Sequence, residues 1–179
     1  IHNVYDNLDE LPSNVNLAGA EIDLIGVEGR EFILKETLDQ IKDLYDYILI
    51  DCPPSLNILT VNAMAAADSV IVPIQCEYYA LEGLSQLIHT INLIQERLNE
   101  SLSIDGIVFT MYDKRTNLSS EVIENVKENI HLKIYDTVIP RNVRLAEAPS
   151  YGLPIHMYDG KSAGAVAYDN LAKEIIESE

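Results

Sequence analysis

Asp51 is the residue whose place in the chain best suits chemistry. It ends the apolar run at residues 47–51 and is followed by Cys52 and two prolines. In an open α/β sheet, ligands bind beyond the carboxyl ends of the strands, so a carboxylate there can face a ligand. Such an aspartate holds the Mg²⁺ of a bound nucleotide in phosphate-handling enzymes. It could instead cap the helix that follows. Spacing alone leaves both roles open.

Five apolar stretches predict buried strands, with helical patterns between them. The runs are continuous rather than alternating, which is typical of strands covered on both faces. We expect the strands at residues 8–12, 47–51, 69–75, 104–111 and 134–139. Apolar residues at three-to-four spacing predict helices within 32–41, 81–98, 118–126 and 165–175. This alternation implies an α/β fold with a doubly wound, mainly parallel sheet.

Length and composition indicate an ordinary globular protein. The 179 residues predict a single domain over 1–179, and 47% hydrophobic with 23% charged residues excludes a disordered or fibrous chain. No apolar run approaches the ~20 residues that span a bilayer. Residues 1–30 also lack a basic-then-apolar leader. The expected compartment is the cytoplasm.

The net charge of −17 argues against nucleic acid at first sight, because phosphate neutralisation needs Lys and Arg. Its distribution is uneven. Residues 111–161 carry seven acidic side chains and seven basic ones, namely Lys114, Arg115, Lys127, Lys133, Arg141, Arg144 and Lys161. This neutral window leaves room for a DNA-binding face, although uneven sampling of solvated charge would give the same pattern.

Three further motifs predict packing rather than chemistry. Cys52 and Cys76 each adjoin an apolar run, so we expect buried, reduced thiols. The pair Tyr78-Tyr79 is expected to pack against the protein. The stretch Gly160-Lys161-Ser162 resembles the end of a phosphate-binding loop, but Ile155 stands where that motif requires its first glycine. We therefore interpret it as a loop before the last helix.

Four collinear segments resemble the ParA/MinD class of partition ATPases. Within that class, the resemblance is closest to the chromosomal, Soj-like ParA branch. The segments are YDYILIDCPPSLNILTVNAMAAAD (45–68), VIVPIQCEYYALEGLSQL (70–87), GIVFTMYDKRTNL (106–118) and TVIPRNVRLAEAPSYGLPI (137–155). The resemblance runs from residue 8 to residue 176. It implies a deviant P-loop NTPase fold, of which this chain lacks the first strand and the phosphate-binding loop.

The resemblance implies a nucleotide-switched partition protein. The full-length protein is expected to be a cytoplasmic, nucleoid-associated ATPase that uses ATP and Mg²⁺. It would form a homodimer, bind DNA nonspecifically and respond to a ParB-like partner. It would not bind a membrane. Without a phosphate-binding loop, this truncated ParA-like domain alone should neither hydrolyse nor hold ATP. The alternatives are a MinD-like membrane-associated ATPase, which the acidic residues 172–179 disfavour, and a nonenzymatic interaction domain.

Several residues receive nucleotide roles from the resemblance. Asp51 matches the Walker B carboxylate, the expected catalytic and magnesium-binding residue. Pro53, with Pro54, turns the chain so that the next loop approaches the γ-phosphate. Pro140 and Asn142 border the adenine, whose edge suits an amide that both donates and accepts. Asn142 could equally cap a helix at 143–148. Thr110 and Met111 are expected to touch the base from the other side.

Four basic residues receive DNA roles. Arg115 and Arg144 match arginines that bind DNA without sequence preference, and a guanidinium offers phosphate a planar fork of donors. Lys114 and Arg141 are expected auxiliaries. One or two arginines neutralise too few phosphates for useful affinity, so the resemblance implies binding by a dimer.

Overall fold

The computed structural model describes residues 1–53 and 56–178. Contacts divide the chain into two compact units. Unit 1 contains residues 1–68 and 96–102, and unit 2 contains residues 69–95 and 103–179. The prediction of a single domain is not tested by this division. None of the helices in the described part of the chain is long and apolar enough to cross a membrane.

A parallel sheet forms the centre of unit 2. Its strands are β3 (Ser69–Gln75), β4 (Ser103–Tyr112) and β5 (Ile134–Pro140), in the order β3-β4-β5. The apolar runs of β3 and β4 bury Val72, Ile107 and Phe109 almost completely. Three of the five predicted strands are thereby confirmed, two with slightly wider bounds.

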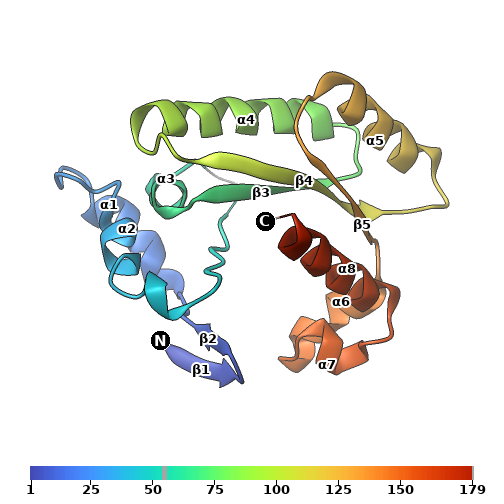
Figure 1. The fold of residues 1–179 in the computed structure, drawn as a ribbon, viewed down its shortest axis with the longest axis horizontal. Helices are drawn as coiled ribbons and strands as arrows, with labels where there is room; N and C mark the ends of the chain where they lie inside the picture. The colour runs from blue at the N-terminus through green and yellow to red at the C-terminus, as the bar shows by residue number, and fades with distance from the viewer. Residues whose placement is uncertain (54–55, 179) are drawn as a thin grey trace. The chain divides into compact units, whose positions relative to one another are not determined.

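Helices cover both faces of this sheet. The long helices are α4 (Ala80–Arg97), α5 (Asn117–Asn129) and α8 (Ala163–Glu177). In Figure 1, α4 and α5 lie on one side of the sheet and α8 on the other. On the α8 side, a buried cluster joins the strands to the helix through Val108, Tyr135, Ile139, Ala167 and Leu171. The predicted α/β fold with a doubly wound, parallel sheet is confirmed.

Short helices connect β5 to α8. They are α6 (Val143–Glu147), a 3₁₀ turn (Ala148–Tyr151) and α7 (Ile155–Asp159). Ser162 then caps α8, because its hydroxyl accepts from the Ala165 amide at 3.2 Å. The stretch Gly160-Lys161-Ser162 is therefore the loop before the last helix, as predicted.

Gly164 lets α8 approach α6 closely. A Cβ there would lie 2.5 Å from Leu145 Cγ, whereas a Cβ at Gly83 of α4 would meet nothing within 4 Å. Gly164→Ala should therefore lower the free energy of unfolding by about 1–3 kcal/mol through overpacking. Gly83→Ala should raise it by about 0.5–1 kcal/mol, since alanine suits a helix better. Urea unfolding measures both changes, and equal shifts at the two glycines would contradict this contact.

Glu174 of α8 fastens the helix to the edge strand β5. Its carboxylate accepts from the amides of Asp136 at 2.6 Å and Thr137 at 3.0 Å. Burial raises the pKa of Glu174, but these hydrogen bonds outweigh burial and hold the pKa below its ordinary value. A depressed pKa means that the stabilisation is present above the ordinary carboxyl pKa and is lost as the pH falls through the depressed one.

Glu174→Ala should accordingly lower the free energy of unfolding at neutral pH by about 1–3 kcal/mol. Glu177→Ala, at the exposed end of the same helix, is the matched control and should change little. Urea unfolding at pH 7 and at acidic pH measures the difference. A Glu174→Ala deficit of the same size at both pH values would contradict a role for the charged carboxylate.

Unit 1 contains a hairpin and short helices. The strands are β1 (His2–Tyr5) and β2 (Leu8–Glu10), and the helices are α1 (Ala20–Asp23), α2 (Ile33–Leu38) and α3 (Ile58–Ala66), with 3₁₀ turns at Val15–Gly19 and Lys42–Leu44. The buried Asn62 joins α2 to α3. Its Oδ1 accepts from the Leu34 amide at 3.1 Å, and its Nδ2 donates to the carbonyl oxygens of Arg30 and Ile58.

Two strand predictions in unit 1 need correction. Residues 8–12 give only β2, which is exposed and pairs antiparallel with β1 instead of lying in a parallel sheet. Residues 47–51 form no strand, and Leu49 within them is 87% exposed. An apolar run shows the capacity for a strand, but a strand also needs a neighbour to complete its hydrogen bonds. No strand among the described residues pairs with 47–51.

Candidate functional site

The carboxyl ends of β4 and β5 bring together the four predicted base-contacting residues. Tyr112 pairs with Pro140, and the Arg141 amide donates to the Tyr112 carbonyl at 2.9 Å. Thr110 lies at the same edge, where its hydroxyl donates to the carbonyl of Ile74 in β3 at 3.3 Å. Ligands of parallel sheets bind at this edge. The structure thus gathers Thr110, Met111, Pro140 and Asn142 in unit 2.

Met111 has an unusual backbone. Its φ is 55°, in the left-handed region, and the pairing of β4 with β5 is irregular between Phe109 and Tyr112. A side-chain-bearing residue in this region costs of order 1 kcal/mol or more, and such strain concentrates at functional sites. The left-handed backbone of Met111 therefore lies at this irregularity, one residue before β4 ends.

Asn142 caps α6. Its Oδ1 accepts from the Arg144 amide at 2.8 Å, while its own backbone is extended, as expected of an N-cap residue. The capping alternative is therefore confirmed. The cap uses only the side-chain oxygen, and the predicted contact of Asn142 with adenine stays a prediction.

Arg115 is held by a carboxylate of its own loop. Its Nε donates to Asp113 Oδ1 at 2.9 Å, and its Nη2 donates to Asp113 Oδ2 at 2.6 Å. The Arg115 amide also donates to Asp113 Oδ1, at 3.0 Å. These hydrogen bonds from Arg115 hold the pKa of Asp113 far below its ordinary value. The side chain of Arg115 is 80% exposed, so the pair lies at the surface.

Arg144 lies in a second ion-pair cluster, which joins α6 to α7. Its Nη1 donates to Glu147 Oε2 at 2.8 Å, and its Nε lies 3.4 Å from Asp159 Oδ2. Tyr158 donates its hydroxyl to the same Glu147 oxygen at 3.1 Å. The hydrogen bonds from Arg144 and then Tyr158 lower the pKa of Glu147. Glu147 is therefore anionic at neutral pH.

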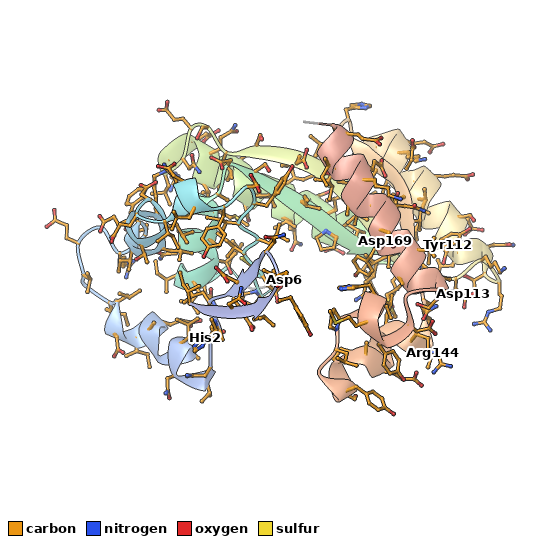
Figure 2. All side chains as sticks on the ribbon, turned by 60° about the horizontal axis from the view of Figure 1, so that its bottom comes forward. His2, Asp6, Tyr112, Asp113, Arg144 and Asp169 are labelled. Carbon is orange, nitrogen blue, oxygen red and sulfur yellow. The ribbon has the colours of Figure 1, made fainter. Side chains whose placement is uncertain are left out.

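The four predicted DNA-binding residues share one end of unit 2. Lys114 and Arg115 follow β4, and Arg141 and Arg144 follow β5, its neighbour in the sheet. All four are exposed. Figure 2 shows Asp113 and Arg144 at the same end of the unit. The structure thus places the basic residues beside the predicted base-contacting residues.

Asp51 lies in unit 1, in an exposed stretch without regular structure. The next helix, α3, is capped by Asn57, whose Oδ1 accepts from the amides of Leu59 and Thr60 at 3.1 and 3.0 Å. The alternative that Asp51 caps this helix is therefore wrong. Pro53 is likewise exposed, and Pro54 lies outside the described residues.

Asp51 fits a Mg²⁺ ion that a nucleotide brings with it. Among residues 1–53 and 56–178, no group of three or more His, Cys, Asp and Glu side chains could hold a metal by itself. Mg²⁺ in nucleotide sites takes one or two carboxylates and completes its shell with phosphates and water. A single exposed carboxylate suits that chemistry. The role remains a prediction.

The two cysteines differ in their surroundings. Cys76 is buried, as predicted, whereas Cys52 is exposed, because the run that precedes it is not covered as a strand. Nearby protein atoms, and then the Asp51 carboxylate, raise the pKa of the Cys52 thiol. Burial raises the pKa of Cys76 to about 11. Both thiols are thus protonated at neutral pH and are poor nucleophiles.

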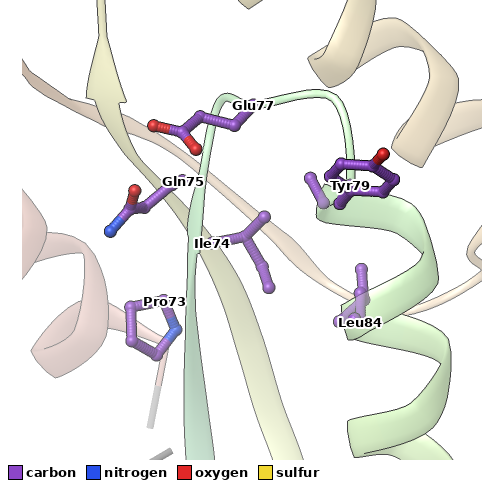
Figure 3. Close-up of a pocket in the computed structure, with 8 residues that line it drawn as sticks. Pro73, Ile74, Gln75, Glu77, Tyr79 and Leu84 are labelled. Atoms are coloured by element: carbon purple, nitrogen blue, oxygen red, sulfur yellow. The ribbon is translucent and has the colours of Figure 1, made fainter.

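An open pocket of about 210 Å³, which the sequence did not indicate, lies where β3 leads into α4. Figure 3 shows Gln75, Glu77 and Tyr79 around it. Tyr79 and its neighbour Tyr78 are 73% and 79% exposed, and their rings meet edge to face at 5.1 Å. The expectation that this pair packs against the protein is wrong, because both side chains are mostly exposed in the turn between β3 and α4.

The acidic partners of the arginines were also missed. Arg144 and Glu147 stand three residues apart in a helix, so their spacing was a usable signal. Asp113 and Arg115 stand two residues apart on a loop, and that spacing gives no such signal. Nothing local in the sequence connects Tyr158 and Asp159 with Arg144, because α7 has to fold back onto α6 first.

Known proteins match this chain over nearly its whole length. The sequence model of the AAA domain family matches residues 1–104. The sporulation initiation inhibitor protein Soj of Bacillus subtilis is 58% identical over 170 residues, which are 95% of this chain and 67% of that protein. The chromosome-partitioning ATPase Soj of Treponema pallidum is 53% identical over the same shares.

A solved structure shares the fold. The Mycobacterium smegmatis protein described as cobyrinic acid a,c-diamide synthase, with bound ADP and magnesium, superposes with a TM-score of 0.79 at 38% identity. The match covers 93% of this chain and 61% of that one. The chain thus spans about two thirds of the length of its relatives.

Fold and relatives together define the class, which is that of the P-loop ATPases. Within it, the chain belongs to the ParA/Soj family of chromosome-partitioning ATPases.

Proposed function

We propose that the full-length gene product is an ATP-dependent partition protein. ATP and Mg²⁺ convert it to a dimer, the dimer binds DNA nonspecifically on the nucleoid, and a ParB-like partner stimulates hydrolysis and release. The observation that carries the proposal is the 58% identity to Soj over 95% of the chain. The remaining third of such a protein would supply the phosphate-binding loop.

Within this chain, two groups of residues contact the nucleotide and its metal ion. Asp51 binds Mg²⁺ directly or through water, and Pro53 directs the following loop toward the γ-phosphate. Thr110, Met111, Pro140 and Asn142 border the adenine at the carboxyl edge of the sheet. When bound, Mg²⁺ neutralises charge that develops on the β- and γ-phosphates.

Arg115 and Arg144 contact the DNA, and Lys114 and Arg141 contribute beside them. These residues are exposed after β4 and after β5, with Arg144 on α6, in a chain whose net charge is −17. A locally basic edge on an acidic protein can bind phosphates only if several contacts act together. Pairing of two protomers doubles the number of contacts.

Binding of the full-length gene product to a DNA duplex of arbitrary sequence tests this function. Affinity should be high with ATP, low without nucleotide, and should fall steeply across a salt series. Anionic lipid vesicles serve as the comparison, because the MinD-like alternative predicts ATP-dependent binding to vesicles instead. DNA binding that is absent, or indifferent to ATP, would refute the proposal.

A further inference from the structure

Both arginines assigned to DNA already bind a carboxylate of their own protein. Asp113 accepts from Arg115 through both of its oxygens, and Glu147 accepts from Arg144. Labels in Figure 2 mark Asp113 and Arg144 at the end of unit 2 where β4 and β5 finish. An arginine–carboxylate pair thus occurs both on the loop after β4 and on α6, the helix that follows β5.

Both carboxylates are less exposed than the arginines that they bind. The Asp113 side chain is only 18% exposed, against 80% for Arg115, and it also accepts from the Arg115 backbone amide. Glu147 accepts a second hydrogen bond, from Tyr158, whose ring stacks on Tyr151 at 5.0 Å. Each carboxylate therefore has a hydrogen bond in addition to those that it accepts from the guanidinium.

A guanidinium binds carboxylate and phosphate with the same donors. Its planar fork matches two oxygens of either group, so a carboxylate that fills the fork occupies the place of a phosphate. The pairs are two and three residues apart in the chain, which keeps the carboxylate at a high effective concentration. DNA must displace it to reach the arginine.

We infer that Asp113 and Glu147 are built-in competitors of DNA phosphate, which bind Arg115 and Arg144 in the DNA-free protein and thereby set its affinity for DNA. Asp159, 3.4 Å from Arg144, strengthens the competition on α6. The inference rests on the proposed function, because it presumes that these arginines contact DNA. It assigns to the carboxylates a positioning role that acts only through the arginines.

The test compares variants of the full-length gene product with ATP, using a DNA duplex of arbitrary sequence at fixed salt. Asp113→Asn and Glu147→Gln keep the shape and the neutral hydrogen bonds but weaken the ion pairs. Each should bind DNA about 3- to 10-fold more tightly than wild type. Glu124→Gln is the charge-matched control, since Glu124 is an exposed carboxylate of α5 with no ion pair among the described residues.

A second background separates competition from general charge. In Arg115→Ala protein, adding Asp113→Asn should no longer tighten binding beyond the gain from Glu124→Gln. The inference is overturned if Asp113→Asn and Glu147→Gln gain no more than Glu124→Gln, or if the gain persists without Arg115. Two separate variants keep the test decisive should one of them fail to fold. Wild-type protein that never binds DNA would instead refute the proposed function.

Discussion

Asp51→Asn should lower the Mg²⁺-dependent ATP turnover of the full-length gene product by at least roughly 100-fold, because it removes a charged ligand from the metal. The structure excludes the competing role of Asp51 as a helix cap, since Asn57 caps α3. The melting temperature should therefore stay close to that of wild type. Steady-state phosphate release across a Mg²⁺ series measures the effect.

Asp46→Asn is the matched control for this change. Asp46 is a nearby exposed carboxylate, so its loss should leave turnover near the wild-type value. If a large Mg²⁺ excess restored much of the activity of Asp51→Asn, the defect would lie in metal affinity, as expected. Turnover of Asp51→Asn equal to that of Asp46→Asn would show that Asp51 has no role in the site.

Arg144→Glu should weaken ATP-dependent DNA binding roughly 10- to 100-fold, because a dimer loses two phosphate contacts and gains two repelling charges. The new carboxylate also faces Glu147 and Asp159, the present partners of Arg144. The slope of affinity against salt should become shallower. Fluorescence anisotropy with labelled duplex measures both quantities.

Lys127→Glu gives the same change of charge from an exposed position on α5 and should weaken binding much less. Because Arg144 follows a cap that Asn142 provides, the affinity for ATP must be measured in parallel. Intact DNA binding by Arg144→Glu would remove Arg144 from the interface. Equal losses in both variants would indicate only a general dependence on charge.

Sequence patterns predicted unit 2 well and unit 1 poorly, for a physical reason. The strands β3 to β5 pair with one another and carry helices on both faces, so their continuous apolar runs match what they bury. Residues 47–51 have an equally apolar run, but they lack a paired strand among the described residues. Hydrophobicity reports a capacity for burial and carries no information on whether a partner strand is present.

The candidate site shows the same limit. The resemblance located the residues at the ends of β4 and β5, and the structure brings them together there. It did not reveal that Arg115 and Arg144 are bound to carboxylates, since it reports residue types and not side-chain geometry. The resemblance also did not predict the positive φ of Met111, because methionine rarely adopts the left-handed region.

The close packing of Leu145 against Gly164 affects how mutations near Arg144 are interpreted. Leu145 adjoins Arg144 in α6. The contact of Leu145 with Gly164 therefore also helps to place the Arg144 side chain at the surface. A purely apolar change at Gly164 would crowd the Leu145 side chain, and any shift of α6 that relieved the crowding would move the guanidinium without altering any charge. Loss of DNA binding in such a variant would show that the position of the Arg144 side chain matters. It would not show that its charge is needed.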